Sequence, residues 1–416
     1  MGLHPSLSIL GSRPGMLRGE CIVLGVTGGA AAYKAVDLAR LLMRMGARVY
    51  PVMTRTACSL VGPRLLHWAT GFEPVTELTG GIEHIGLAHE CSCMVIAPAT
   101  LHTLMEVVEG LASSPVSATA HEFLGLGKPV IAAPSMHGGL YAEALRLVRE
   151  RGCGGLVVVE PLLEEGKAKP PPVEALAWIV EAVALRGRDA SGLRVLVTAG
   201  PTREYIDSVR FISNPSTGLM GFSLAFEAYA RGARVTLIHG PLSLGVLDTV
   251  RRYACSVSGF TCIEVESTDE MAEAVASESP GTDIAFHAAA PADFRPRRRF
   301  EGKIPSREGL VLELERTRSV IGESRARVNV AFTAKPASSL EELAGIARRR
   351  LEELGVDIVA ANPAGRGEAG FASGMNELAV AVRGGATWFI PLTGKRLAAR
   401  RLLDVALAYY SPRPYT

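Results

Sequence analysis

Short apolar runs alternate with segments of helical spacing along the first half of the chain. Buried strands are expected at 21–26, 48–53, 94–97, 130–133 and 156–159. Between the first two runs, residues 31–45 have helical spacing, with Ala35 and Leu38 on the apolar side. Gly46 follows, at the position where a glycine commonly ends a helix. Apolar strands that alternate with helices predict a parallel sheet covered on both faces.

The same alternation restarts after a short polar, glycine-containing break near residues 186–192. Strands are expected at 194–198, 233–239, 283–289 and 357–361, helices at 218–231, 339–354 and 395–410, and a hairpin at 377–382 and 387–391. A chain of 416 residues is also too long for one ordinary core.

The pattern therefore predicts the α/β class, with two tandem three-layer doubly wound domains. We expect each domain to be an open, doubly wound sheet covered by helices on both faces. The expected divisions are an N-terminal extension (1–19), a first domain (20–186), a linker (187–192) and a second domain (193–416).

Charge excludes some classes of partner. The 44 Lys and Arg residues nearly balance 42 Asp and Glu residues, so a net charge of +2 gives no reason to expect a nucleic-acid partner. The basic run 295–299 is interpreted as a solvated loop. No apolar run reaches the roughly 18–20 residues that span a bilayer, and the first twenty residues lack the apolar core of a signal peptide. We therefore expect no membrane association.

The seven cysteines are scattered and odd in number. Cys91 and Cys93 form a C-x-C pair with no second cluster, so no zinc site or other metal site is predicted. Such cysteines indicate a reducing, cytoplasmic setting, in which disulfides are not expected.

The first strand leads into a turn of small residues, G-V-T-G-G-A-A-A-Y-K, at residues 25–34. Thr27 and backbone N–H groups here can close on a phosphate at a helix N-terminus. The glycine spacing is not G-x-G-x-x-G, and the second strand ends in Met53-Thr54 without an acid for a ribose. FMN therefore suits the turn better than a dinucleotide. The expected cofactor-binding residues are Gly25, Thr27, Gly28, Lys34, Thr54, Ala97 and Thr100.

The third strand ends in A-P-A-T, residues 97–100, at the edge where open α/β sheets bind ligands. His84 lies in the segment before that strand. A lone histidine is more often structural than catalytic, but this position also allows a general base.

These motifs, with P-S-M-H at 134–137, are similar in order and spacing to the flavin-containing cysteine decarboxylases, in particular those that act on phosphopantothenoylcysteine. The resemblance implies FMN bound between the subunits of a trimer, with His84 as the catalytic base. His137 stands where that family has an Asn that holds the substrate carboxylate. Ser113-Ser114 replace its Asn-Asp pair.

The cysteine clamp of bacterial members, whose thiol returns a proton to the product, is replaced by E-E-G-K-A-K-P at 164–170. His137 can still donate to a carboxylate, and Lys167 can still deliver a proton. The P-x-M-H and E-E-G-K-A-K variants resemble the archaeal branch of this family.

Two polar motifs open the second half. A-G-P-T-R-E at 199–204 makes a tight bend at Gly200, and R-F-I-S-N-P-S-T-G-L-M-G at 210–221 leads into a helix. One helix cap needs one residue of the Asn, Ser, Thr or Gly type, whereas four lie together here. Asn214, Ser216, Thr217 and Gly218 therefore predict an anion or acyl-phosphate site.

The predicted strand at 283–289 leads into Ala289, Ala290 and Asp293, and small residues there allow a nucleotide to approach the backbone. Lys303 lies on an exposed, Arg-rich loop and is a candidate clamp for polyphosphate, although a surface lysine is more often only solvated.

These motifs resemble phosphopantothenate–cysteine ligases over nearly all of residues 193–410. The resemblance implies that Lys303 assists nucleotidyl transfer to the carboxylate of 4′-phosphopantothenate. Asn214 and Arg210 hold the acyl-nucleotide while the amine of cysteine attacks. Ala289, Ala290 and Asp293 line the nucleotide pocket, and Phe332 is expected with them.

The reaction needs Mg2+ and a lysine to neutralise the triphosphate, and the chain has no P-loop sequence. Lys335 replaces a Glu that the ligase family has, so both CTP and ATP stay open as co-substrate.

Together the resemblances imply a flavodoxin-like, FMN-binding fold followed by a Rossmann-like ligase fold. They also imply a homo-oligomeric coenzyme A biosynthesis enzyme, with trimeric flavin domains and dimeric ligase domains. Three alternatives remain: a ligase with a degenerate regulatory flavin domain, a flavin prenyltransferase-like first domain and, more weakly, a dinucleotide-dependent oxidoreductase.

Overall fold

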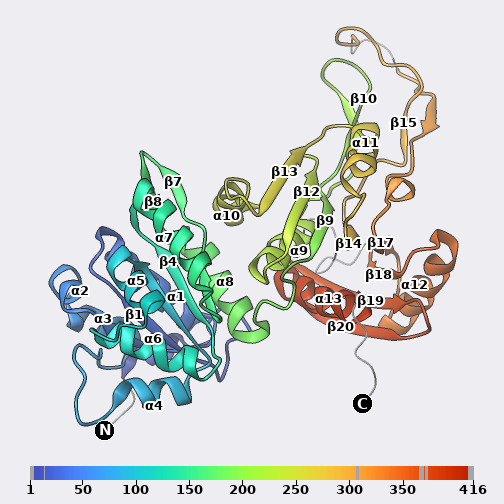
Figure 1. Ribbon diagram of the computed structural model, residues 1–416. Helices are drawn as coiled ribbons and strands as arrows, with labels where there is room; N and C mark the ends of the chain where they lie inside the picture. Colours follow the sequence, from blue (N-terminus) through green and yellow to red (C-terminus); the bar gives the residue numbers. More distant parts are fainter. Residues whose placement is uncertain (1–3, 14, 306–308, 365–369, 371–372, 411–416) are drawn as a thin grey trace. The chain divides into compact units, whose positions relative to one another are not determined.

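The computed structural model describes residues 4–13, 15–305, 309–364, 370 and 373–410, and divides into two compact units. One unit runs to Arg188 and includes Ser256–Ser258, and the other begins at Asp189 (Figure 1). Asp189 binds the buried guanidinium of Arg231 through two hydrogen bonds of 2.8 and 2.6 Å. The break between the units therefore falls inside the polar stretch 186–192.

The first unit contains a five-stranded parallel sheet with the order β2-β1-β3-β4-β6. Its strands are β1 (Cys21–Val26), β2 (Arg48–Met53), β3 (Cys93–Ala99), β4 (Val130–Pro134) and β6 (Leu156–Val158). Every residue of β1, β3 and β4 is buried, as the continuous apolar runs predict. This strand order is that of the flavodoxin-like fold.

Helices cover both faces of this sheet. α4, α5, α6 and α7 share a hydrophobic core with one face, and α1 packs on α3 and α8 at the other. The helices are α1 (Lys34–Arg44), α2 (Arg55–Leu60), α3 (Pro63–Thr70), α4 (Glu83–Glu90), α5 (Leu101–Glu109), α6 (Pro115–Gly125), α7 (Gly138–Arg151) and α8 (Val173–Arg186). A short 3-10 turn, Ala30–Tyr33, precedes α1, so the predicted helix begins a few residues later than the apolar spacing suggested.

The described residues before β1 pack on the first unit. A 3-10 helix covers Pro5–Ile9, and the side chain of Leu17 is fully buried. The backbone N–H groups of Gly11 and Leu17 donate to carbonyl oxygens at the end of α1 and just after it. The predicted extension is therefore part of the same compact unit.

The second unit has an eight-stranded sheet with the order β13-β12-β9-β14-β17-β18-β19-β20. The strands are β9 (Arg194–Ala199), β12 (Arg234–His239), β13 (Phe260–Glu264), β14 (Ile284–His287), β17 (Val328–Lys335), β18 (Ile358–Pro363), β19 (Met375–Val382) and β20 (Thr387–Gly394). The first six are parallel, and counted along the chain their order is 3-2-1-4-5-6, as in Rossmann folds. The predicted C-terminal hairpin, β19 with β20, extends this sheet in antiparallel fashion.

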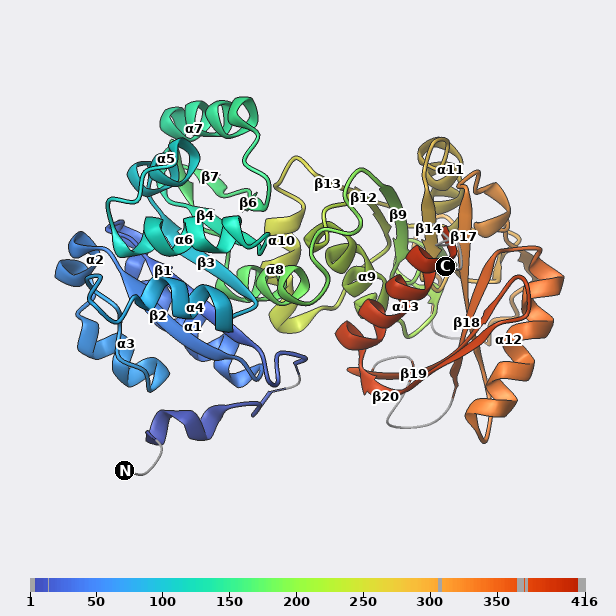
Figure 2. The ribbon, with the colours of Figure 1, turned by 60° about the horizontal axis from the view of Figure 1, so that its bottom comes forward.

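The helices again form outer layers, as Figure 2 shows. α11 and α12 pack on one face of the sheet through apolar clusters, and α9 packs with α13 on the other. They are α9 (Leu219–Ala230), α10 (Asp248–Ala254), α11 (Thr268–Glu278), α12 (Leu340–Leu354) and α13 (Lys395–Tyr410). The predicted class of two three-layer α/β domains is confirmed.

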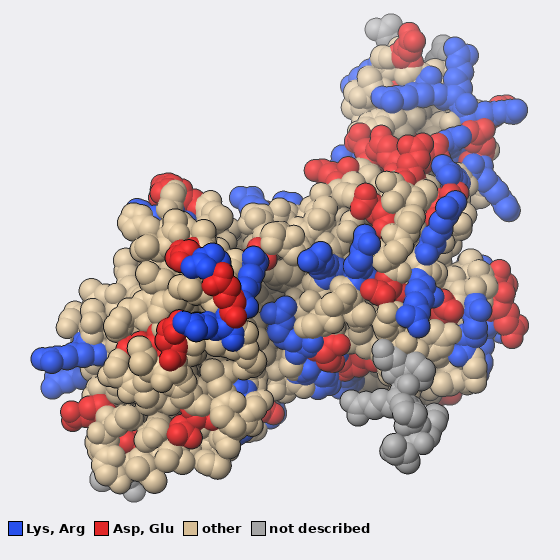
Figure 3. All heavy atoms as spheres, viewed as in Figure 1, with Lys and Arg blue, Asp and Glu red and all other residues tan. Residues whose placement is uncertain are grey.

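Two short hairpins of the second unit lie outside its large sheet. β10 (Arg203–Tyr205) pairs with β11 (Phe211–Ser213), and β15 (Phe294–Pro296) pairs with β16 (Leu314–Arg316). The interpretation of the basic run 295–299 as a solvated loop is wrong at Arg295, which lies in β15 and binds the carboxylates of Asp269 and Glu315. Figure 3 shows acidic and basic side chains intermingled in this region.

Four of the seven cysteines are paired, contrary to the expectation from their scatter. Cys21 is bonded to Cys91, and Cys255 to Cys262. The first pair joins the start of β1 to the residue after α4, which are distant in sequence but adjacent in the sheet layer. Cys58, Cys93 and Cys153 are free. Among the described residues, no helix is both long and apolar enough to cross a bilayer.

Candidate active sites

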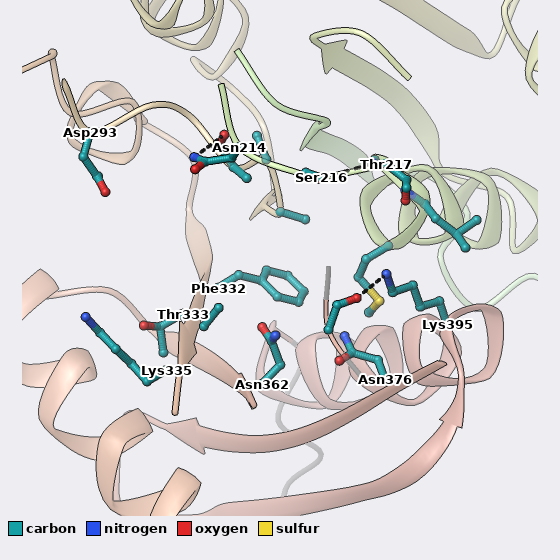
Figure 4. Close-up of a pocket in the computed structure, with 18 of the residues that line it drawn as sticks. Asn214, Ser216, Thr217, Asp293, Phe332, Thr333, Lys335, Asn362, Asn376 and Lys395 are labelled. Atoms are coloured by element: carbon teal, nitrogen blue, oxygen red, sulfur yellow. Dashed lines mark hydrogen bonds between the residues drawn. The ribbon is translucent and has the colours of Figure 1, made fainter. Parts of the chain in front are cut away.

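A cavity of about 430 Å³ lies in the second unit at the carboxyl edge of its sheet. It opens beside the carboxyl ends of β9 and β14, which are neighbours in the sheet. The strand order reverses between these two strands, and open α/β sheets bind ligands at such a switch point. The start of α9, the segment after β14 and the ends of β17 and β18 supply its walls. Figure 4 shows their polar side chains around one space.

The start of α9 lies at this cavity because the backbone of the helix approaches that of β9 closely. Gly218 has φ +76°, and a Cβ there would lie 2.1 Å from a methyl carbon of Leu242. A Cβ on Gly221 would lie 2.8 Å from the carbonyl oxygen of Thr198 in β9. Only glycine allows this contact between helix and strand. The first N–H groups of α9 and its dipole therefore face the cavity, an arrangement that suits an anion.

Asn214 lies beside Ser216 and Thr217 on the same side of the cavity. Its Nδ2 donates to the carbonyl oxygens of Ala290 and Pro291, at 3.1 and 2.9 Å (Figure 4). Both amide hydrogens are thereby used inside the protein. The orientation fixes Oδ1 as the atom that remains for another partner. Asn214 thus ties the segment after β11 to the segment after β14.

Cationic groups lie on the far side of the same cavity, on Lys335 and Lys395. Lys395 begins α13 and is 6% exposed, and its Nζ donates to the carbonyl oxygen of Gly370 at 2.8 Å. Burial lowers the pKa of Lys395 to about 8. A buried ammonium without a carboxylate partner among its described contacts favours a site that receives a negatively charged ligand.

Most of the predicted nucleotide site converges on this cavity. Its walls include Asn214, Ser216, Thr217, Gly218, Ala289, Ala290, Asp293 and Phe332. Gly200 does not line it but supports it. Its φ is +77°, and its carbonyl oxygen accepts a hydrogen bond from the N–H of Ala290.

Arg210 and Lys303 do not line the cavity, but the structure brings their segments together. The buried carboxylate of Asp207 accepts hydrogen bonds from the backbone N–H groups of Val209, Arg210 and Ile304. These bonds, with that of Arg210 the strongest, lower the pKa of Asp207. Arg210 Nη2 then donates to the carbonyl oxygen of Ile304 at 2.6 Å. Asp207 therefore organises the loop that carries the exposed Lys303.

The first unit has a second cavity, of about 390 Å³, at the turn into α1. It is lined by Ala30, Ala31, Tyr33 and Lys34 on one side, and by the segments 135–137 and 167–170 on the other. A small three-stranded sheet brings those two segments together, with β5 (Met136–His137) beside β8 (Lys167–Lys169) and β7 (Leu162–Glu164) beyond it.

The segment 164–170, which stands in place of the cysteine clamp, presents the ammonium of Lys167 to this cavity. His137 is paired with Lys167 across β5 and β8. Lys169 instead binds Glu164 and Glu165, both at 3.1 Å. Among the described residues Lys167 has no ion-pair partner. Its ammonium, unlike that of Lys169, therefore remains available to a ligand.

The other predicted flavin-site residues are placed around the turn after β1. Thr27 is fully buried, where its Oγ1 donates to the carbonyl oxygen of Pro98 and accepts from the N–H of Thr100. It therefore binds the two loops together. Thr54 caps α2 through the N–H of Ala57. These residues, with Ala97, do not line the cavity of the first unit.

Packing is tight at two glycines of the motif at residues 25–34, Gly25 in β1 and Gly28 in the turn after it. A Cβ on Gly28 would lie 2.4 Å from a carbon of Thr56, and one on Gly25 would lie 2.8 Å from the methyl of Met94. Gly25 is thus fitted to the core of the sheet, whereas Gly28 allows the turn to meet α2.

His84 lies in the first turn of α4, and its Nδ1 is buried without a hydrogen-bond partner among the described residues. Ile82, the residue before α4, has φ +47°. A buried imidazole nitrogen with nothing to bind is expected where a ligand supplies the partner.

Sequence reasoning missed part of the lining of the cavity in the second unit. Thr333, Asn362, Asn376 and Lys395 also line it. Asn362 and Asn376 are 8% and 3% exposed, and buried amides need partners. The sequence did contain a signal for this part of the cavity, namely the polar residues inside the apolar strands β18 and β19.

The fold and the two cavities define a two-domain α/β protein in which a flavodoxin-like unit precedes a Rossmann-like unit. The family model "Flavoprotein" matches residues 10–185, and the model "DNA/pantothenate metabolism flavoprotein C-terminal domain" matches residues 190–409. The chain belongs to the family of coenzyme A biosynthesis bifunctional CoaBC proteins.

Relatives of that name align along both units. The protein of Thermococcus kodakarensis is 38% identical over 97% of this chain and 98% of its own length. That of Methanocaldococcus jannaschii is 31% identical over 86% of this chain and 87% of its own. A crystal structure of the C-terminal domain of a CoaBC protein covers 53% of this chain and 96% of its own, with 30% identity and a TM-score of 0.42.

Proposed function

We propose that the second unit joins 4′-phosphopantothenate to cysteine at the expense of a nucleoside triphosphate, and that the first unit decarboxylates the product to 4′-phosphopantetheine. The chain thus carries a ligase and a lyase of coenzyme A biosynthesis. The observation that carries the ligase assignment is the cavity where Asn214, the start of α9 and Lys395 surround one space.

The ligase chemistry follows from the charges around that space. A carboxylate is a poor acylating agent until a good leaving group is attached, and transfer of a nucleoside monophosphate supplies one. The N-terminus of α9 and the cations of Lys335 and Lys395 suit the triphosphate tail. Asn214 and Asp293 face each other across the upper part of the cavity, where Asn214 Oδ1 remains free for a donor.

Arg210 and Lys303 act from the loop organised by Asp207 in this proposal. That loop places Arg210 against Ile304, the residue after Lys303, so both cations belong to one loop, as recognition of a pantothenate phosphate and an acyl-phosphate requires. Arg210 would hold the acyl-nucleotide together with Asn214, and Lys303 would assist nucleotidyl transfer.

Mg2+ would enter this site with the nucleotide. The described residues contain no group of three or more His, Cys, Asp or Glu side chains able to hold a metal. Mg2+ is commonly bound through phosphates and one or two carboxylates, and Asp293 is the carboxylate that lines the cavity. CTP and ATP both remain possible co-substrates.

The residues of the first unit fit FMN at the turn into α1. The small side chains of Ala30 and Ala31 line the cavity there, and the dipole of α1 favours a phosphate. His84 does not line this cavity, and its buried Nδ1 lacks a partner among the described residues. FMN supplies an electron sink that eases loss of CO2 from the cysteine moiety. His84 would take up a proton, His137 would hold the substrate carboxylate, and Lys167 would return a proton to the product.

We further propose a cytoplasmic homo-oligomer with trimeric flavin domains and dimeric ligase domains. Large apolar side chains on the hairpins of the second unit support self-association: Val209, Phe211, Phe294 and Leu314 are 56%, 41%, 48% and 47% exposed.

One coupled assay tests both activities. Purified protein would be incubated with 4′-phosphopantothenate, cysteine, Mg2+ and either CTP or ATP, with FMN present, and the products would be identified by mass. The ligated and the decarboxylated species should both form. A ligated product that never loses CO2 would favour a regulatory flavin domain, and no ligated product with either nucleotide would refute the ligase assignment.

A further inference from the structure

Helix α4, which carries His84 in its first turn, buries little of its own surface. It has eight residues, all of them described, and among these only Ala88 has a buried side chain, which packs in the apolar core of the first unit. Gly86 lies inside the helix. Helices this short are marginally stable in water, and an internal glycine weakens them further. The position of α4, and hence that of His84, therefore depends on interactions at its two ends.

The N-terminal end of α4 is weakly held. Ile82, the residue before the helix, provides no side-chain cap and has φ +47°, a left-handed conformation that is strained for a residue with a branched side chain. The carboxylate of Glu83 accepts a hydrogen bond from the backbone N–H of Thr79 at 3.1 Å, but this bond is exposed to solvent. The hold on the helix must therefore come mainly from the other end.

The C-terminal end of α4 is bound by the ammonium of Lys128, which lies between α6 and β4. Lys128 Nζ donates to the carbonyl oxygens of Ala88, His89 and Cys91, at 2.7, 2.9 and 2.9 Å. An ammonium has three hydrogens, so these three oxygens match its donor capacity. The last turn of a helix leaves such carbonyl oxygens without partners inside the helix, and a positive charge there also suits the helix dipole.

A covalent bond holds the same end of the helix. Cys91, the residue after α4, is bonded to Cys21 at the start of β1, and both side chains are buried. The next residue, Ser92, donates its backbone N–H to the carbonyl oxygen of Cys21 at 2.9 Å. Since every residue of β1 is buried, the end of α4 is fixed to a strand in the interior of the first unit.

His84 lies at the far end of α4 from these two anchors. At a rise of about 1.5 Å per residue, it is about 10 Å away from Cys91 along the helix. A tilt of about 6° at the anchored end would move the imidazole by about 1 Å, and misplacement on this scale can lower a rate about 10²-fold. The anchors at the start of the sheet can therefore affect chemistry at its carboxyl edge.

We propose that Lys128 and the bond between Cys21 and Cys91 are positioning groups for decarboxylation, which hold His84 in place through α4. Neither group has to touch the substrate or the flavin, because both act on the opposite end of the helix. This inference rests on the proposed function of the first unit and adds the groups that keep its general base in position.

The first test measures the hold on α4 without any substrate. Hydrogen–deuterium exchange of full-length, flavin-loaded protein would be compared by mass spectrometry with that of Lys128→Met, which keeps the side-chain length but removes the donors. The amides of α4 should exchange about 10-fold faster or more in the variant, while those of β1 keep their rate. Lys128→Arg restores donors at this position and should bring the exchange back toward that of the unmodified protein.

The second test measures decarboxylation of phosphopantothenoylcysteine by flavin-loaded protein. In Lys128→Met, kcat should fall about 10-fold to 100-fold with KM nearly constant, because a misplaced base slows the reaction without weakening substrate binding. Cys21→Ala/Cys91→Ala should have the same kind of effect. Cys255→Ala/Cys262→Ala, which removes the disulfide of the second unit, is the matched control and should leave decarboxylation unchanged.

A positioning role also predicts that the effect of Lys128 depends on His84. In a His84→Asn background, Lys128→Met should lower the residual single-turnover rate by less than about 2-fold, since no imidazole is left to misplace. An equal loss with and without His84 would show that Lys128 supports the unit as a whole, and would overturn the proposal.

The outcomes separate this inference from the proposed function. If the unmodified protein with FMN releases no CO2, the decarboxylase function fails, and the exchange measurement alone decides whether Lys128 fixes α4. Unchanged exchange of α4 in Lys128→Met overturns the inference, as does an unchanged kcat in both this variant and the disulfide variant. If Lys128→Met does not fold, Cys21→Ala/Cys91→Ala decides by the same two measurements.

Discussion

His137 and Lys167 occupy directly paired positions on the antiparallel strands β5 and β8, at the cavity beside the turn into α1. We expect Lys167→Ala to lower the rate of decarboxylation about 10²-fold or more, because a positioned proton donor contributes on that scale. Ligation should be unaffected. Both products would be quantified by mass. Lys169→Ala is the matched control, since Lys169 is held by Glu164 and Glu165. Equal effects of the two substitutions would argue against a proton-donor role.

His84→Asn should remove CO2 release while ligation continues. The buried Nδ1 of His84 lacks a partner in the described structure, and an amide cannot take up a proton at neutral pH. A loss of about 10²-fold to 10⁴-fold is expected for a general base. Flavin absorbance of the purified variant would show whether FMN is still bound. Undiminished decarboxylation by a flavin-loaded variant would exclude His84 as the base.

Asn214→Asp should stall the ligase after nucleotidyl transfer. The substitution replaces the two hydrogens that bind the carbonyl oxygens of Ala290 and Pro291 with an oxygen that repels them. The new charge also faces an anionic intermediate. We expect ligation to fall at least about 10²-fold, the loss typical of one removed electrostatic donor. Mass spectrometry without and with cysteine would detect an acyl-nucleotide that accumulates. Ligation at the normal rate would remove Asn214 from the site.

The lowered pKa of Lys395 predicts that nucleotide binding depends on pH. Its folded-state pKa, lowered by burial to about 8, lies below that of the unfolded chain. The buried ammonium therefore disfavours folding below pH 8, and this cost disappears as the pH rises above it. A bound triphosphate favours the ammonium, so binding should take up a proton above pH 8.

Nucleotide affinity should accordingly be constant below pH 8 and fall by up to about tenfold per pH unit above it. Isothermal titration calorimetry in two buffers with different ionisation enthalpies measures both the affinity and the proton uptake. Lys395→Met should abolish the uptake. An uptake that persists in this variant would assign the pH dependence to another group.

The bond between Cys21 and Cys91 should stabilise the first unit. It closes a chain segment with a sequence separation of 70, and loops of that length typically give about 2–4 kcal/mol. A reducing agent, or the Cys21→Ala/Cys91→Ala variant, should lower the melting temperature of the flavin half. Cys153→Ser provides the control, since Cys153 is free. Equal melting in oxidising and reducing buffer would show that this bond contributes nothing.

The strands of both large sheets were predictable because their burial makes them uniformly apolar. β1 and β2 end where the sequence predicts, and α13 begins at the predicted Lys395. The small hairpins were not predictable. β10 and β11 have three residues each and hold together through contacts with distant segments, which no short sequence window contains.

The residues of the candidate sites were also only partly predictable from the sequence. Asn214, Asp293 and the glycine at 218 belong to compact motifs, so the sequence located them and they do meet in one cavity. Lys395 is the first residue of a helix and would be taken as solvated. Only the packing of α13 beside β19 buries it. Likewise the pairing of Cys21 with Cys91 depends on a sheet order that cysteine spacing does not encode.

The close fit of α9 against β9 at Gly221 has an evolutionary consequence. Any Cβ at Gly218 or Gly221 meets neighbouring atoms within 2.8 Å, so the end of the cavity suited to phosphates is shaped by main chain and tolerates little drift. The opposite side is built from side chains such as Phe332, Thr333 and Lys335, which can be exchanged without moving the helix. A change of preferred nucleotide among descendants of this protein would therefore begin at those side chains.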